Sequence, residues 1–269
     1  MKRFAFSCLL VAVIFCHTSI AHSGGWTQPK GKGYFKLSEQ IVNANSVFRP
    51  NGDKWEIPVT VNRYTTSLYG EFGLIDRLTI VGYMPVYKHL NLDGDDTLTG
   101  VGDWDIGIRI GLLTNRATVI SLQAMAGLPL GEAEKDKFLW TGDSEFNQHI
   151  SLQVGHSLYP LPAYLKGEVG FNNRRGDDNP EDDYADEIRY SLEAGYTIAE
   201  RVGISVWLRG VDALGDLEPR NDSQYLSFGP EVHLYVTPNA GFTASMTRFT
   251  RGYNVLDAPA WEFGLFLKL

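Results

Sequence analysis

Hydrophobic and polar residues alternate along much of the chain with the two-residue period of an extended strand. In residues 102–112, Trp104, Ile106, Ile108, Ile110 and Leu112 alternate with Asp103, Asp105, Gly107, Arg109 and Gly111. Residues 163–172 and 187–198 repeat the pattern. Because successive side chains of a strand point to opposite faces, each segment has one apolar face and one polar face. The sequence predicts an all-β chain.

Short and long connections alternate strictly between these segments. About twelve strands are expected. The short connections are 75–77, 114–116, 159–162, 199–201 and 237–239, and the long ones are 44–62, 88–100, 131–144, 173–186, 212–223 and 247–259. This alternation is typical of a transmembrane antiparallel β-barrel with short periplasmic turns and long external loops. It places both termini on the short-turn side.

The carboxyl-terminal segment WEFGLFLKL indicates the same architecture. Trp261, Phe263, Leu265, Leu267 and Leu269 share one face of an extended chain, as expected for a last strand that faces lipid and pairs with the first strand. A soluble β-sandwich is the alternative, since its strands also alternate. The predicted strands run about ten residues, enough to cross a bilayer at a tilt, whereas sandwich strands average nearer six.

The amino terminus has the pattern of a secretory signal peptide. Lys2 and Arg3 precede an apolar run from residue 4 to 15, and Ser19-Ile20-Ala21 supplies small residues before a cut after Ala21. We therefore expect a signal peptide over 1–21 and a single mature barrel domain over 22–269. The expected location is the outer membrane of a Gram-negative bacterium.

Charge and cysteine content exclude several classes of partner and site. Loss of Lys2 and Arg3 with the signal peptide changes the net charge from −8 to −10, and an acidic chain argues against a nucleic-acid partner. Both cysteines, Cys8 and Cys16, lie in the segment expected to be removed. The mature chain should therefore have no disulfide, and we expect no cofactor.

The cost of charge in lipid predicts which face lines the lumen. A lysine or arginine facing lipid at mid-depth costs about 2–4 kcal/mol, so the charged rows should face inward and form cross-strand ion pairs. The predicted lumen-lining residues are Lys36, Glu71, Asp105, Arg109, Lys166, Glu168, Arg189, Glu193, Arg209 and Glu231. Glu39 is an exception, because it shares a face with Phe35, Leu37 and Ile41. A bulge or a position near the membrane interface are the two explanations that the sequence leaves open.

Aromatic residues make the predicted lumen amphipathic. The aromatic residues on the strand faces that are predicted to point into the lumen would suit a small solute with an apolar or ring-shaped part. They are Tyr69, Tyr83, Tyr87, Trp207, Tyr225 and Tyr235. A second aromatic set, Trp26, Trp104, Tyr159 and Trp261, is interpreted as interface anchors.

Catalytic and metal chemistry have weaker signals. His149-Ile150-Ser151 has the His-x-Ser spacing of the outer-membrane phospholipases. However, Leu152-Gln153 stands where that motif has Asn-Gly. The His149 and Ser151 side chains also fall on the strand face that is predicted to line the lumen, whereas a lipid-cleaving site should face the bilayer. Acidic residues at 93–96 and 177–183 lack an ordered calcium-loop pattern, and the histidines have no metal-ligand spacing. We expect no catalytic residues and no metal site, and thus no enzyme.

A family resemblance rests on three stretches. The segment GVGDWDIGIRIGLL, 100–113, resembles the Gly-x-Gly-Asp signature of the outer-membrane family of meta-pathway phenol degradation proteins, and SLYGEFGLIDRLTIVGYMPVY, 67–87, resembles its strand-turn-strand unit. The segment GWTQPKGKGY, 25–34, is similar to the start of related barrels encoded near exopolysaccharide genes. The resemblance implies a channel or transporter for small, often aromatic compounds.

These observations favour passive uptake or efflux of a small amphipathic solute through the barrel. The expected partners are that solute, outer-membrane lipid and lipopolysaccharide, and the barrel-assembly machinery, which would recognise the carboxyl-terminal strand. A non-enzymatic barrel that supports assembly or export of surface polysaccharide is the alternative. An outer-membrane lipid hydrolase is a minor alternative.

Overall fold

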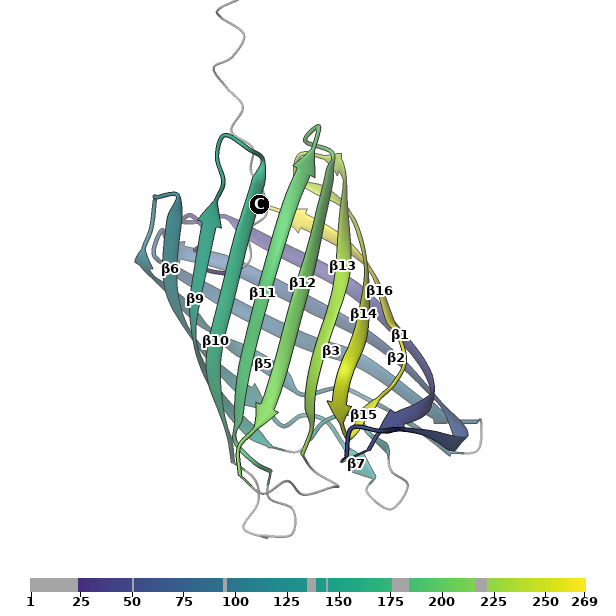
Figure 1. Ribbon diagram of the computed structural model, residues 1–269. Coiled ribbons are helices and arrows are strands. Elements are labelled where there is room, and N and C mark those ends of the chain that lie inside the picture. The colour runs from purple at the N-terminus through teal and green to yellow at the C-terminus, as the bar shows by residue number, and fades with distance from the viewer. Residues whose placement is uncertain are drawn as a thin grey trace, which may run out of the picture.

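Twelve long antiparallel strands close into a barrel in the computed structural model, which describes residues 24–49, 51–93, 96–134, 139–143, 145–175, 184–215 and 222–269 (Figure 1). The long strands are β1 (Gly33–Phe48), β2 (Lys54–Ile75), β3 (Leu78–Leu92), β5 (Trp104–Leu113), β6 (Thr118–Leu128), β9 (Phe146–Ser157), β10 (Ala163–Arg175), β11 (Glu187–Ile198), β12 (Val202–Ala213), β13 (Gln224–Thr237), β14 (Ala240–Tyr253) and β16 (Ala260–Lys268). Short strands are β4 (Asp96–Gly100), β7 (Ala133–Glu134), β8 (Leu139–Trp140) and β15 (Val255–Leu256).

The first and last long strands close the barrel. β1 pairs with β2 on one side and with β16 on the other, and the β1–β16 ladder runs from Tyr34 opposite Lys268 to Val42 opposite Ala260. Closure leaves no open sheet edge, which is what the hydrocarbon layer requires because it offers no water to backbone N–H and C=O groups. The predicted antiparallel outer-membrane barrel is confirmed.

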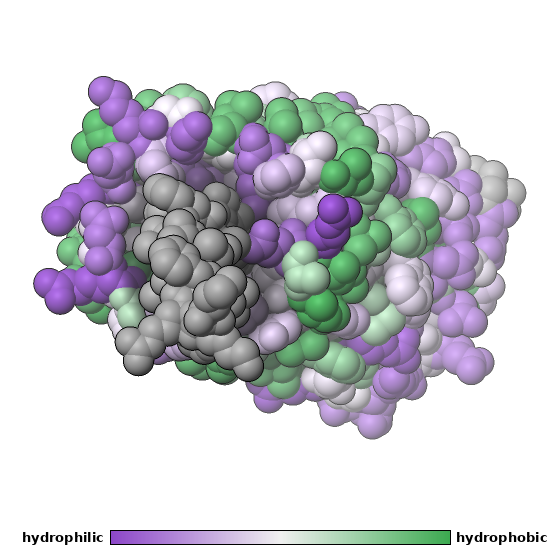
Figure 2. Space-filling model, turned by 90° about the horizontal axis from the view of Figure 1, so that it is seen from above, coloured by the Kyte–Doolittle hydropathy of each residue, from purple (hydrophilic) through white to green (hydrophobic). Residues whose placement is uncertain are grey.

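The wall has an apolar outer face and a polar inner face. On β16, the outward Phe263 and Leu265 are each 52% exposed, whereas the inward Phe266 is 3% exposed. Other strands repeat this arrangement, with outward leucine, isoleucine, valine and aromatic side chains exposed. Hydrophobic residues line the outside in the view from above, and hydrophilic residues gather near the ends of the barrel (Figure 2). The alternation in the sequence therefore separates a lipid-facing surface from the interior.

The five short connections lie where the sequence predicts them. They join β2 to β3, β5 to β6, β9 to β10, β11 to β12 and β13 to β14, at the same end of the barrel as the carboxyl terminus (Figure 1). Asn115, Ala199 and Glu200 have positive φ angles in two of these turns. By the topology of such barrels, this is the periplasmic end.

Several expected long loops are instead strand. β1 continues to Phe48 and β2 begins at Lys54, so much of 44–62 is a paired hairpin. Ala44 pairs with Val61 but Ser46 pairs with Glu56, which leaves Pro58 in a bulge where its missing N–H breaks no ladder bond. β3 and β14 likewise extend into the expected loops 88–100 and 247–259. Backbone pairing continues here beyond the region in which side chains alternate, so the side-chain pattern marked the strand ends too early.

Within the described ranges, no helix has the length and apolar character needed to cross a membrane. The expected signal peptide over 1–21 lies outside the described residues and stays a prediction.

The two faces of the wall should respond oppositely to added charge. We expect Leu265→Arg, on the lipid-facing side, to lower the free energy of unfolding by about 2–4 kcal/mol, because a guanidinium at that depth loses its hydration. Ser245→Arg is the matched control, since Ser245 faces inward in register between Glu231 and Glu262. Urea unfolding in lipid vesicles measures both variants. Equal destabilisation by the two substitutions would contradict the assignment of the faces.

Candidate functional site: the barrel interior

All of the predicted lumen-lining residues face the interior. Lys36 is in register with Phe266 and Tyr69, on the face opposite to the exposed Phe35 and Leu37. The same alternation places the rest of the set inside: Glu71, Asp105, Arg109, Lys166, Glu168, Arg189, Glu193, Arg209 and Glu231.

Opposite charges pair across strands in part of this set. The Lys36 ammonium lies 2.6 Å from the Glu262 carboxylate and 3.4 Å from that of Glu231. The Lys166 ammonium lies 2.7 Å from the carboxylate of Glu193, its direct partner on β11. Among the described residues, Asp105 and Glu168 make no ion pair. The interior charges are therefore compensated in some places and open to solvent or solute in others.

The most deeply buried pair joins β5 to β2. Arg109 Nη1 lies 3.0 Å from Glu71 Oε1, and Arg109 Nε and Nη2 donate to Gln123 Oε1 at 3.1 and 2.9 Å. The Tyr69 hydroxyl donates to the same Glu71 carboxylate. Arg109 is 2% exposed. Because a buried charge is tolerated only when paired and hydrogen-bonded, this cluster should be a fixed part of the wall.

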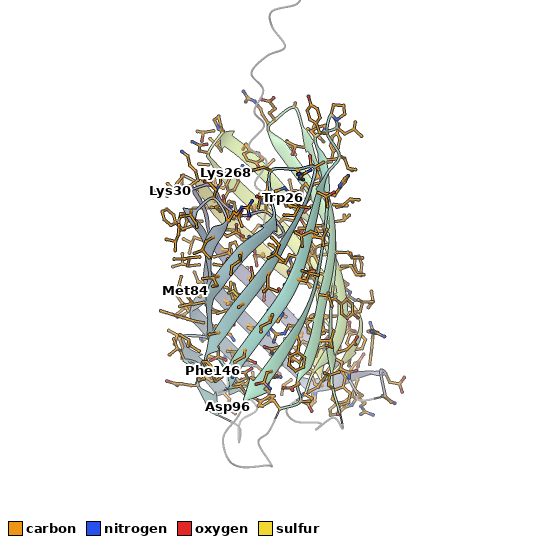
Figure 3. All side chains as sticks on the ribbon, turned by 90° about the vertical axis from the view of Figure 1, so that its left-hand side faces the viewer. Trp26, Lys30, Met84, Asp96, Phe146 and Lys268 are labelled. Atoms are coloured by element: carbon orange, nitrogen blue, oxygen red, sulfur yellow. The ribbon has the colours of Figure 1, made fainter. Side chains whose placement is uncertain are left out.

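A segment that precedes the first strand lies inside the periplasmic end of the barrel. We call residues 24–32 the N-terminal strap. The Gly25 N–H donates to Gln153 Oε1 (3.1 Å), and Arg109 Nη1 donates to the Trp26 carbonyl (3.1 Å). Gln28 donates twice, from its backbone N–H to Thr79 Oγ1 and from its side-chain amide to Glu71 Oε2, both at 2.8 Å. These contacts run from β9 to β2 along the inner wall. Trp26 and Lys30 lie at the same end as Lys268 (Figure 3).

Trp26 is not an interface anchor, so that interpretation of the sequence is wrong. Its ring lies edge-on to Tyr164, with centroids 6.2 Å apart, inside the barrel. It packs over Gly155, where an added Cβ would come within 2.4 Å of the ring. The sequence pattern could not show this, because it assigns a strand face but does not say which distant segment covers it.

An aromatic cluster fills the other side of the periplasmic end. The Phe266 ring lies 5.1 Å from that of Tyr235, 5.5 Å from that of His233 and 6.0 Å from that of Tyr34, measured between centroids. Phe266 and Tyr34 are buried. The strap and this cluster together pack the interior at the short-turn end.

The middle of the barrel is more open. Tyr83 faces inward, in register with Tyr69, yet is 39% exposed. The Arg189 side chain is 37% exposed, although its guanidinium pairs with the Glu187 carboxylate at 2.7 Å. The Arg209 guanidinium stacks over the buried Trp207 ring at 4.3 Å. The interior therefore retains solvent-accessible space bordered by aromatic rings and charges.

Tyr87 does not contribute to this space, contrary to the sequence prediction. The β2–β3 register shifts between Thr66 and Ser67, so Tyr87 pairs with the outward Thr66, whereas Pro85 pairs with the inward Ser67. A one-residue irregularity reverses the face of every side chain beyond it.

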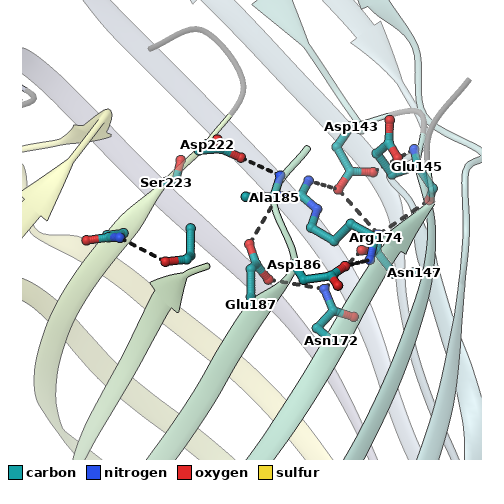
Figure 4. A network of polar contacts seen from close by, with 12 residues as sticks. Asp143, Glu145, Asn147, Asn172, Arg174, Ala185, Asp186, Glu187, Asp222 and Ser223 are labelled. Carbon is teal, nitrogen blue, oxygen red and sulfur yellow. Dashed lines mark hydrogen bonds and ion pairs between the residues drawn. The ribbon is translucent and has the colours of Figure 1, made fainter. Parts of the chain in front are cut away.

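A polar network occupies the long-loop end, from residues that the sequence analysis did not select. Arg174 lies 2.6 Å from Asp143 and 3.1 Å from Glu187, and Asn172 donates to Glu187 and to Asn147 (Figure 4). Arg174 fell within the expected loop 173–186, but it belongs to β10. The sequence analysis missed this residue because it ended the strand at residue 172, whereas β10 continues to Arg175.

The aspartate of the Gly-x-Gly-Asp signature holds loop ends together. Asp103 accepts backbone hydrogen bonds from Gly131 (2.8 Å) and Asp143 (2.7 Å). Burial raises the pKa of the Asp103 carboxyl, against the opposing effect of these two donors. Lys88 donates nearby to the Thr141 carbonyl. The signature therefore has a structural role at the outer mouth.

His149 and Ser151 do not form a nucleophile and base. Both face the interior and pack over Gly170, where a Cβ would meet His149 Nε2 at 2.4 Å and Ser151 Cβ at 2.7 Å. No hydrogen bond joins the two side chains, and both His149 Nε2 and Ser151 Oγ lack a partner in the described part of the chain. A catalytic pair needs a hydrogen bond between its members.

The acidic segments considered for cations lie partly or wholly outside the described residues. In the part of the chain that the structure does describe, no three His, Cys, Asp or Glu residues are grouped to hold a metal ion.

Comparisons with known proteins agree with the fold. The COG4313 outer membrane channel from Pseudomonas putida F1 superposes with a TM-score of 0.76 at 14% identity, covering 93% of this chain and 100% of that one. The NanC porin gives a TM-score of 0.60 at 8% identity, covering 87% and 100% of the two chains. A search of curated proteins gave no significant match.

The first of these proteins is an outer membrane channel and the second is a porin, and this chain shares their fold, which agrees with the expected location. The expectation of a non-enzymatic barrel agrees with the family and with the channel structure. The sequence profile described as "Putative MetA-pathway of phenol degradation" matches residues 38–256. The chain belongs to this family of outer-membrane barrels.

Proposed function

We propose that the protein is an outer-membrane channel for passive passage of small amphipathic solutes. The observation that carries the proposal is the solvent-accessible middle of the interior, where Tyr83 and Arg189 face inward yet remain substantially exposed. A barrel filled with side chains along its whole length would bury both residues.

The chemistry of the wall indicates the class of solute. The exposed Tyr83 ring lies in register with Asp105, and Tyr225 lies near Arg189 and Arg209, so a molecule with a ring and a polar group would find partners for both parts. The family description, which names phenol degradation, supports the aromatic part of this proposal.

The N-terminal strap would control passage at the periplasmic end. It is held by hydrogen bonds to the inner wall and to the β2–β3 turn and by the Trp26–Tyr164 contact, none of them covalent. Local opening of such a segment requires much less free energy than unfolding of the barrel. We infer that release of the strap widens the path for solute in either direction.

The polysaccharide alternative rests on the resemblance of residues 25–34 to barrels of exopolysaccharide loci. In this structure those residues form the strap and the beginning of β1. No contact among the described residues favours that role over the channel, and it stays an untested alternative, as do lipopolysaccharide and the assembly machinery as partners.

Charge reversal in the open middle of the barrel should change ion selectivity. We expect the protein to conduct in planar bilayers and Arg189→Glu to shift the reversal potential in a salt gradient toward that of a cation-selective pore, because the variant replaces a partly exposed cation beside Glu187 with a second anion. Arg251→Glu is the control, since the Arg251 side chain is 62% exposed and contacts the outward Tyr190. An electrically silent barrel that is also impermeable to small solutes would overturn the proposal.

Loosening the strap should increase conductance. Gln28→Ala removes the side-chain hydrogen bond to Glu71, and loss of about 1 kcal/mol of anchoring should raise the ratio of open to closed barrel about fivefold. Single-channel recording measures the open fraction. Asn239→Ala, in the β13–β14 turn at the same end, is the control. An increased open fraction in Asn239→Ala, or an unchanged open fraction in Gln28→Ala, would argue against gating by the strap.

A further inference from the structure

One row of the inner wall carries two opposite charges that do not pair with each other. The row consists of Glu168, Ser191 and Arg209, which are in register across β10, β11 and β12. Within the described part of the chain, neither the Glu168 carboxylate nor the Arg209 guanidinium forms an ion pair. The Arg209 side chain is exposed, and those of Glu168 and Ser191 are partly exposed. The row therefore borders the open part of the interior.

The charges on both sides of this row are already compensated. Toward the periplasmic end, the Lys166 ammonium lies 2.7 Å from the Glu193 carboxylate. Toward the long-loop end, the Arg189 guanidinium lies 2.7 Å from the Glu187 carboxylate. The row between these ion pairs differs from them, because its two charges stay available to a molecule in the lumen.

Stacking on Trp207 keeps Arg209 apart from Glu168. The Arg209 guanidinium lies 4.3 Å from the centre of the Trp207 ring. That ring is buried and packs over Gly229, where an added Cβ would come within 2.8 Å of it. Two strand spacings of about 4.8 Å each separate the backbones of Glu168 and Arg209, and only the small Ser191 lies between them. The cation–π contact holds the guanidinium on its side of the row, so the two charges face one space without meeting.

The row also lies at the margin of the N-terminal strap. Gln153 of β9 is in register with Glu168 and accepts the Gly25 N–H at 3.1 Å. Trp26 packs over Gly155, which is one row nearer the periplasmic end. A solute that enters from the long-loop end therefore meets Glu168 and Arg209 where the strap begins to close the path.

We propose that this row binds a small zwitterion, with its carboxylate on Arg209, its ammonium group on Glu168 and its body over Ser191. A guanidinium offers two parallel N–H donors to a carboxylate, and an ionised carboxylate accepts from an ammonium group. A solute with a single charge fits less well, because Glu168 repels an anion and Arg209 repels a cation. The inference rests on the proposed channel, since the solute reaches the row through the lumen, and it narrows the solute from amphipathic to dipolar.

Isothermal titration calorimetry of the full chain in detergent micelles tests the proposal without requiring conduction. The probes are para-(aminomethyl)benzoate, which is a zwitterion, and two relatives with one charge each, para-methylbenzoate and para-methylbenzylamine. We expect the zwitterion to bind about tenfold more tightly than either relative, because each relative lacks one charge-assisted hydrogen bond. Equal affinities of the three probes, or no saturable binding of the zwitterion, would overturn the proposal.

Two variants assign the two ends of the ligand. Arg209→Gln should abolish the preference for the zwitterion over para-methylbenzylamine and keep its preference over para-methylbenzoate. Glu168→Gln should do the reverse. Arg251→Gln is the matched control, because it removes an outward cation that is 62% exposed, and it should keep both preferences. Loss of both preferences in one single variant, or of neither preference in both, would overturn the proposal.

Conductance separates this inference from the channel itself. A barrel that conducts in planar bilayers but binds the three probes equally would contradict the zwitterion site and leave the channel standing. A barrel that prefers the zwitterion but neither conducts nor passes solutes would contradict the channel and retain the site.

Discussion

The pairing of β1 with β16 is the constraint on which the rest of the structure depends. A membrane has no water to satisfy backbone N–H and C=O groups, so the sheet must close. Closure fixes the register of every strand relative to its neighbours, from Tyr34 opposite Lys268 around the ring to Gly33 opposite Phe72. Once the register is fixed, each side chain faces either lipid or the interior, and the polarity of both surfaces follows.

The interior combines packed and open regions, and the difference between them gives the barrel its proposed function. At the periplasmic end, Arg109, Glu71 and Gln153 are buried under the strap and tied to it by hydrogen bonds. In the middle, Tyr83 and Arg189 remain exposed. A buried ion pair is weak evidence for stability, because desolvation offsets much of its Coulomb attraction. The Arg109–Glu71 pair makes better sense as a fixed surface on which a removable segment rests.

Glu39 shows how the outer wall accommodates an exception to the alternation. No register irregularity redirects it, since the shift in β1 lies between Ala44 and Ser46. Its row lies next to the row of the outward Tyr64 and Trp261, and tyrosine and tryptophan gather at membrane interfaces. Of the two explanations that the sequence leaves open, a position near the interface is the one that fits.

The sequence by itself determined the barrel, the end with short turns and the interior position of residues such as Lys36 and Glu193, because alternation is a local property that directly encodes the two faces of a strand. It did not determine the strand ends at β1, β2 and β10, because backbone pairing outlasts the side-chain pattern. The face of Tyr87 and the place of Trp26 were also beyond it. A register shift at Thr66 and Ser67 decides the first, and packing against Gly155, more than a hundred residues away, decides the second. Which charges pair, where the interior stays open and what covers the inner wall depend on contacts between distant segments, and only the closed tertiary structure brings those segments together.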